Sequence, residues 1–188
     1  NITYCTTGMY QNALATAGIE DAEIVVAGPY NISGTAALVG AIKSYENMTG
    51  ETVSQENVDT ATNELVVTGK LAESVGDSDK AEQLVGAVKE QVVEGSDNGK
   101  KLTEEEIGNV VDQAAQEMDV QLSDEDRQEI VDLMDKIKGL DIDVDSLKEQ
   151  AKDLYDKIDD LGLKLDWNQE KVQGFFSKII EFFKNLFS

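Results

Sequence analysis

Three aspartates, Asp141, Asp143 and Asp145, alternate with apolar residues late in the chain. Carboxylates at this spacing open the calcium loops of helix–loop–helix proteins, where they converge on one hard cation. The rest of such a loop does not follow, because its sixth position is Ser146 rather than Gly and its twelfth is Lys152 rather than Glu. The spacing leaves two interpretations open, a calcium site and, favoured here, aspartates that cap the next helix.

A second candidate site is the turn Ser33-Gly34-Thr35, which we expect between a strand and the start of a helix. Backbone amides at such a helix start can hold an anion or a polar ligand. Ser33 as a nucleophile would need a base, which in a chain without histidine would be Lys43 or a carboxylate. The alternative is structural, with Ser33 as a helix cap and Gly34 allowing close packing. We assign no catalytic residue.

Composition excludes several classes of function. The 188 residues include no histidine and one cysteine, and the formal net charge is -22. Without histidine, most hydrolase triads and most zinc or haem sites are excluded, so we expect no cofactor. The negative charge repels nucleic-acid phosphates, so we expect no nucleic-acid partner. The partners that remain are a protein, a cell-wall polymer or a membrane surface, and an enzyme is the less favoured class.

Residues 1–50 differ from the rest of the chain because they are nearly uncharged and rich in small and β-branched residues. The pattern predicts a strand at 2–5, a helix from Thr6 or Thr7, a strand at 22–27 and a helix after Gly34. Two strands joined by a helix would pair in parallel, but two parallel strands alone make a poor sheet. We therefore expect the missing strands to come from a preceding segment, from a partner or from a second copy, the last giving a homo-oligomer through the incomplete sheet.

Residues 51–188 form an acidic region with helical periodicity. Ser54, Thr103 and Ser123 each precede an apolar repeat, and Thr103 is followed by the Glu106 of a capping box. The acidic residues at 103–106 and 123–126 fit the first turn of a helix, where carboxylates complement the helix dipole. The predicted fold is α+β and predominantly α-helical, with a small N-terminal βαβα unit (1–50) followed by a multi-helix region (51–188).

The end of this region, residues 167–187, reads as an amphipathic, aromatic helix. Residues 168–188 carry three lysines and two glutamates, a local charge of +1 in a chain of -22. Such a helix can pack on its own domain, bind a partner or lie in a membrane interface. The residues proposed for a membrane or partner contact are Trp167, Phe175, Phe176, Ile179, Phe183 and Phe187.

Three motifs in the first half of the chain are distinctive. They are Met9-Tyr10-x-Asn12-Ala13-Leu14-x-x-Ala17-Gly18, Ala27-Gly28-Pro29-Tyr30-x-x-Ser33-Gly34-Thr35-Ala36-Ala37-Leu38, and Lys43-x-Tyr45-Glu46. With these motifs, the following Asn63-Glu64-Leu65-Val66, the acidic helices and the aromatic tail, the chain resembles the YpuA-like family of secreted Gram-positive bacterial proteins of unknown function. The resemblance implies an export signal and a further region before the 2–5 strand.

The resemblance also implies an extracellular or cell-envelope location, and it brings no reaction or substrate. We therefore expect a non-catalytic interaction protein of the envelope of a Gram-positive bacterium. Two alternatives stay open at this point. One is a histidine-free hydrolase or transferase that uses the Ser33 turn, and the other is a calcium-responsive structural protein that uses the three aspartates.

Overall fold

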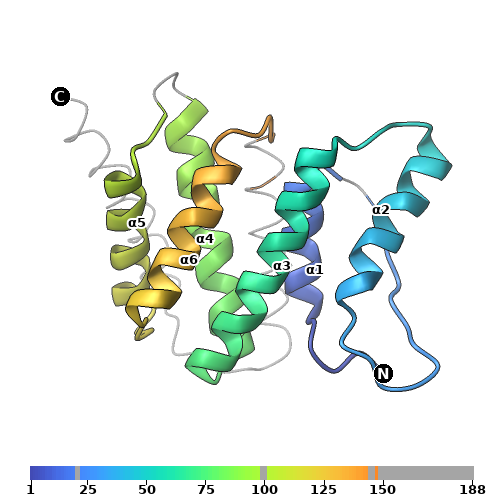
Figure 1. Cartoon of the computed structure of the whole chain (residues 1–188), viewed down its shortest axis with the longest axis horizontal. Helices are drawn as coiled ribbons and strands as arrows, with labels where there is room; N and C mark the ends of the chain where they lie inside the picture. Colours follow the sequence, from blue (N-terminus) through green and yellow to red (C-terminus); the bar gives the residue numbers. More distant parts are fainter. Residues whose placement is uncertain (20–21, 98–100, 144–146, 148–188) are drawn as a thin grey trace. The chain divides into compact units, whose positions relative to one another are not determined.

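Six α-helices follow one another along the part of the chain that the structure describes, which is residues 1–19, 22–97, 101–143 and 147. All of these residues belong to one unit, Asn1–Ala151, of the computed structural model shown in Figure 1. The boundary expected near Gly50 falls inside this unit. The helices are α1 (Thr7–Thr16), α2 (Thr35–Thr49), α3 (Gln55–Val75), α4 (Ser78–Asp97), α5 (Glu104–Glu117) and α6 (Asp124–Ile137).

Hydroxyl side chains begin four of these helices. Thr6 caps α1 and Ser54 caps α3, each accepting a hydrogen bond from the backbone amide three residues later. Thr103 and Ser123 begin α5 and α6 with complete capping boxes. In these boxes the acidic residue of the first turn accepts a hydrogen bond from the amide of the capping residue. The helix starts predicted at 54, 103 and 123 are confirmed, as is the capping role of the acidic clusters.

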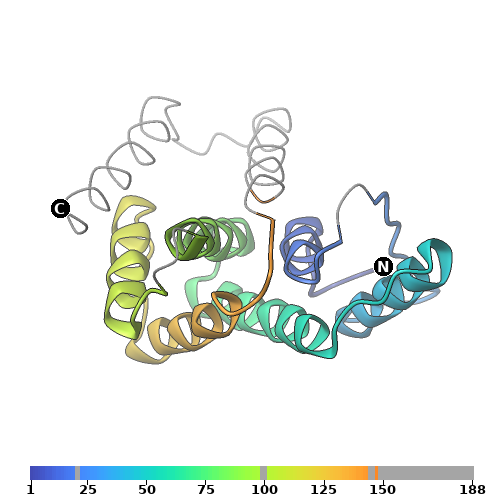
Figure 2. The same cartoon turned by 90° about the horizontal axis from the view of Figure 1, so that it is seen from above.

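The long helix α3 lies at the centre of the arrangement and contacts α1, α2, α4 and α6. Seen from above, α2, α3 and α6 form one row, and α1 and α4 form a second row beside it (Figure 2). Helix α5 packs on α4 and α6. One core cluster lies among α1, α2 and α3, and its largest buried members are Met9, Tyr10, Ile19, Leu38, Ile42 and Leu65.

The expectation of an N-terminal βαβα unit is wrong. Within the described residues the structure forms helices and one isolated parallel bridge, between Ile2 and Ile32, and no strand or sheet. The amide of Thr3 donates to the carbonyl of Ile32 (2.9 Å), and the amide of Cys5 donates to the carbonyl of Ser33 (3.1 Å). The N-terminal segment therefore pairs with the residues just before α2, not with the expected strand at 22–27. The fold class of the described part is all-α.

The segment 22–27 illustrates why local sequence misled the prediction. Its β-branched residues favour an extended backbone, and residues 22–28 are indeed neither helical nor in a turn. Val26 packs against the core cluster while Val25 is 84% exposed, as in a strand with one solvent-exposed face. A strand also needs a hydrogen-bonded neighbour, however, and that neighbour is set by the packing of distant segments rather than by the residues of the strand itself.

Candidate functional site

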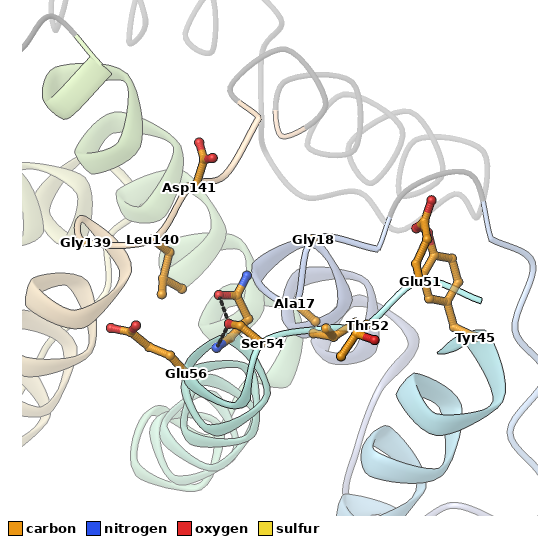
Figure 3. A pocket seen from close by; sticks show the side chains of 12 residues that line it. Ala17, Gly18, Tyr45, Glu51, Thr52, Ser54, Glu56, Gly139, Leu140 and Asp141 are labelled. Carbon is orange, nitrogen blue, oxygen red and sulfur yellow. Dashed lines mark hydrogen bonds between the residues drawn. The ribbon is translucent and has the colours of Figure 1, made fainter. Parts of the chain in front are cut away.

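An open hollow of about 430 Å³ lies where the C-terminal ends of α1 and α6 meet the linker between α2 and α3 (Figure 3). Figure 3 shows Glu56 and Leu140 toward one end of it and the pair Tyr45–Glu51 at the other. The volume falls within the usual range for small-ligand sites, about 300–1,000 Å³. The residues that line it are Ala17, Gly18, Tyr45, Glu51, Thr52, Val53, Ser54, Glu56, Asn57, Gly139, Leu140 and Asp141.

The floor of the hollow is fixed by the hydrogen bonds that join α1 to α3. Ser54 caps α3 by accepting a bond from the amide of Asn57 (3.0 Å), and its hydroxyl donates to Asn57 Oδ1 (2.7 Å). Asn57 Nδ2 then donates to the carbonyl of Thr16 in the last turn of α1 (3.4 Å). Gly18, with φ of 77°, turns the chain away directly after this point. The start of α3 and the end of α1 are therefore held against each other.

The opposite wall is the linker 51–54, which is tied to α2. Tyr45 donates its phenolic hydrogen to Glu51 Oε2 (2.6 Å), and the amide of Val53 donates to Glu46 Oε1 (3.0 Å). Lys43 pairs with the same Glu46 carboxylate (2.7 Å). The hydrogen bond from Lys43, and to a lesser extent that from the amide of Val53, holds the pKa of Glu46 below its usual value. This carboxylate therefore stays ionised and anchors the linker.

The hollow is negatively charged. Glu51 and Glu56 come from the linker and first turn of α3 and Asp141 from the segment after α6, and the twelve described residues that line the hollow include no Lys or Arg. Gly18 and Gly139 lie just beyond the C-terminal ends of α1 and α6, where a helix carries the negative end of its dipole. The N-terminus of α3 also lines the hollow and carries the opposite end of a dipole, so it is the three carboxylates that favour a cationic group over an anion.

Comparison with known proteins places the chain in a family. Residues 1–154 match the family described as protein of unknown function (DUF1002). The chain belongs to the DUF1002 family. It is also 38% identical, over 150 residues, to the uncharacterized protein YpuA of Bacillus subtilis (strain 168), which covers 80% of this chain and 50% of YpuA. The chain thus spans half the length of this curated relative. No solved structure matches it. The predicted resemblance to a YpuA-like family is confirmed.

In this DUF1002 chain, the turn Ser33-Gly34-Thr35 is built into the start of α2. Gly34 is the N-cap of α2 with φ of 94°, and its carbonyl accepts a hydrogen bond from the hydroxyl of Tyr10 (2.5 Å). Burial raises the pKa of Tyr10 to about 12, so the phenol stays protonated as a donor. Ser33 Oγ lies 3.3 Å from Thr35 Oγ1 on the exposed surface. The structure explains Gly34 by packing, while ligand binding by this turn stays a prediction.

The three aspartates are only partly within the described residues. Asp141 lines the hollow, and the carbonyl of Asp143 accepts a hydrogen bond from the amide of Leu147 (3.2 Å). Asp145 lies outside the described residues. Across the described ranges, no three His, Cys, Asp or Glu side chains are grouped so that they could hold a metal ion. The calcium interpretation stays a prediction. Independently of it, Asp141 contributes a carboxylate to the acidic hollow.

The aromatic tail, with Trp167, Phe175, Phe176, Ile179, Phe183 and Phe187, lies outside the described residues, so its membrane or partner contact stays a prediction. Among the helices that the structure describes, none is long and apolar enough to cross a membrane.

Sequence reasoning missed a buried polar cluster at the end of α1. Lys89 Nζ lies 2.9 Å from Glu64 Oε1, and it donates to Thr16 Oγ1 (3.2 Å) and to the carbonyl of Asn12 (2.7 Å). The hydroxyl of Thr16 donates to the second oxygen of Glu64. A hydroxyl beside a lysine and a carboxylate resembles a nucleophile with its base, but Lys89 and Glu64 are 2% and 0% exposed and the cluster does not line the hollow. Its role is to join α1, α3 and α4.

A signal for this cluster is present in the sequence. Glu64 follows Ala61 by three residues and precedes Leu71 by seven, and Lys89 follows Val85 by four, so both ionic side chains fall on the apolar stripes of their helices. A charged residue within an apolar stripe indicates a buried partner. The partner is not identified by spacing, because Glu64 and Lys89 are on different helices.

Proposed function

We propose that this DUF1002 chain is a non-catalytic binding module that holds a positively charged group of a partner protein in the acidic hollow. The observation that carries the proposal is that three carboxylates, those of Glu51 and Glu56 from the start of α3 and its linker and that of Asp141 from the segment after α6, line one open hollow. The segment after α6 brings the charge of Asp141 into the same hollow as two other carboxylates at a cost in repulsion, and a cationic ligand would offset that cost.

The form of the hollow suits a side chain of a partner better than a free apolar ligand. Apart from Tyr45, Val53 and Leu140, its lining consists of small, polar or acidic residues, whereas small-molecule sites are predominantly hydrophobic and aromatic. Lysine and arginine carry an apolar stem and a charged head, so the stem can lie along Val53 and Leu140 while the head meets carboxylates.

The charge of the whole chain supports the same kind of partner. With a formal net charge of -22, the protein attracts basic surfaces over distances of about the Debye length, roughly 8 Å at physiological salt. Such steering raises the association rate of an oppositely charged partner more than that of a neutral one. We therefore expect binding that is fast and weakens steeply as salt is added.

The test is binding of a fluorescent lysine-rich peptide, measured by anisotropy at two salt concentrations. The triple variant Glu51→Gln, Glu56→Gln, Asp141→Asn should weaken binding about tenfold, since three exposed charge pairs at about 0.5 kcal/mol each sum to about 1.5 kcal/mol. The three side chains are part of a wall that stays in place, so the far-ultraviolet circular dichroism should not change.

The matched control removes three exposed carboxylates elsewhere, in the variant Glu105→Gln, Glu117→Gln, Asp132→Asn. Both triples change the net charge by +3, so the difference between them isolates the hollow from general attraction. We expect the control to weaken binding by less than about twofold, because distant exposed charges are largely screened. Equal losses in the two triples would contradict a site in the hollow.

We also propose that the module works outside the cytoplasm, at the envelope of a Gram-positive bacterium. The support is membership of the same family as YpuA of Bacillus subtilis, together with the export signal that the family resemblance implies. Antibodies raised against this chain should label intact, washed cells of the producing bacterium or detect the protein in the culture medium. Detection only after lysis would contradict this location.

A further inference from the structure

We propose that Glu82 is a proton-operated switch at the joint between α1 and α4, which holds the start of α1 tightly when the carboxyl is protonated and loosens it when the carboxyl is ionised. Neither the family nor the acidic hollow assigns a role to this residue. The proposal rests on the geometry of the joint and on the absence of histidine from the sequence.

The carboxyl group of Glu82 is enclosed at the N-terminus of α1. The residue is 5% exposed, and a Cβ added to Gly8 would lie 2.5 Å from its Cδ and Oε1. The carboxyl group therefore occupies the space beside Gly8 that a larger residue would fill, and a side chain there would displace it. The hydroxyl of Thr6, the N-cap of α1, donates to Glu82 Oε2, while Thr6 Oγ1 accepts from the amide of Met9 (3.1 Å). The cap of α1 and the side chain of Glu82 form one hydrogen-bonded unit.

The backbone of α4 is joined to α1 at the same place. Asn12 Nδ2, one turn further along α1, donates to the carbonyl of Glu82 (2.9 Å), and a Cβ at Gly86 would lie 3.3 Å from the amide group of Asn12. A change at Glu82 therefore acts where the two helices are in direct contact, not on a loosely attached side chain.

The charges around this carboxyl group oppose its ionisation. The charged groups that act on it are Asp77 and Asp79, both acidic and both at the start of α4. The ammonium of the adjacent Lys80 donates instead to the carbonyl of Asp119. From α1 the carboxyl meets the Thr6 hydroxyl and the amide of Met9, whose hydrogen bonds favour ionisation but are outweighed by burial. The net effect raises the pKa of Glu82 from 4.5 to about 7.

A side chain that titrates near pH 7 is unusual in a chain of this composition. Side chains other than histidine ordinarily titrate well below pH 6 or above pH 8, and the chain has no histidine. Among the described side chains with displaced pKa values, burial raises those of Tyr4, Cys5 and Tyr10 further above neutrality. The displaced pKa of Glu82, by contrast, falls near pH 7.

The direction of the effect follows from linkage between proton binding and opening of the joint. An opened joint releases Glu82 to water, where its pKa returns to 4.5, so between pH 4.5 and 7 the closed joint binds more protons than the open one. Raising the pH through this window therefore favours opening. With pKa values of 4.5 and 7, the opening equilibrium rises about 20-fold between pH 5.5 and 7.5 and levels off above pH 7.5.

The first measurement is the proton titration of the native protein, compared with that of Glu82→Gln. The difference curve should show one proton with a midpoint near pH 7, and groups common to both proteins cancel. A midpoint below pH 5.5 would overturn the proposal, because it would mean that the joint does not enclose the carboxyl group. Glu105→Gln, an exposed change of the same type on α5, should produce no difference between pH 6 and 8.

The second measurement is hydrogen exchange of the α1 amides between pH 5.5 and 8, corrected for the intrinsic rate of each amide. In the unsubstituted protein the opening of α1 should increase about 25-fold over this range, and in Glu82→Gln it should stay constant. Amides of α5 provide the internal reference. Titration near pH 7 combined with pH-independent exchange of α1 would also overturn the switch, since the proton would then leave without loosening the helix.

Discussion

Replacement of Lys89 by methionine is expected to lower the free energy of unfolding by about 3–5 kcal/mol, because it leaves the carboxylate of Glu64 buried without its cation. The two side chains are 2% and 0% exposed, so water cannot take the place of the lost ammonium. The carbonyl of Asn12 and the hydroxyl of Thr16 lose the same donor. Urea denaturation at pH 7 measures the change.

Two comparison variants distinguish the effect of breaking the buried ion pair from the effect of removing a lysine charge elsewhere. Lys43→Met removes the cation of the Lys43–Glu46 pair, in which the lysine is 63% exposed, and it should cost less than about 1 kcal/mol. The double variant Lys89→Met, Glu64→Met should recover most of the loss, since a buried ion pair and an apolar pair of similar volume are often nearly equal in stability. A double variant as unstable as the single one would show that Lys89 acts through Thr16 and Asn12 instead.

The parts of the fold that sequence predicted correctly are those determined within one turn of helix. Ser54, Thr103 and Ser123 cap their helices with partners three residues away, so the residues of the cap are all visible in one short window. The apolar spacing that predicted α3, α5 and α6 is likewise visible within a short window of sequence. Local rules do not set which distant segments pair, and the expected strand at 22–27 failed for that reason.

The residues of the candidate site also divide into those that a local sequence pattern marks and those that it does not. Asp141 was singled out for a local spacing typical of calcium loops, whereas its neighbours in the hollow, Glu51 and Glu56, carry no motif. They line the same hollow because Asn57 joins the start of α3 to the end of α1, and because α6 ends nearby. The burial of Glu82 could not be predicted for a related reason. A glutamate on an acidic helix is expected to be exposed to solvent, and only the packing of Gly8 against it shows otherwise. Sites assembled from three segments depend on packing that spacing alone does not encode.

Substitution of Gly34 by alanine is expected to destabilise the protein by about 3 kcal/mol, which combines about 1 kcal/mol of backbone strain with about 2 kcal/mol of overpacking. Gly34 has φ of 94°, in the region that side chains disfavour. Its Cβ would also lie 2.4 Å from the hydroxyl of Tyr10 and 2.6 Å from Cγ2 of Ile2. These atoms belong to the N-terminal bridge and the α1–α2 contact, so both would have to shift.

Gly50→Ala is the matched control for this effect. Gly50 follows α2 as Gly34 precedes it and has φ of 78°, but a Cβ there meets nothing within 4 Å. It should therefore show the strain alone, about 1 kcal/mol in chemical denaturation. The difference between the two variants measures how far packing requires a glycine in the Ser33-Gly34-Thr35 turn. Equal losses would remove the structural explanation of Gly34 and return the turn to consideration as a ligand site, because its glycine would then have no packing role to fulfil.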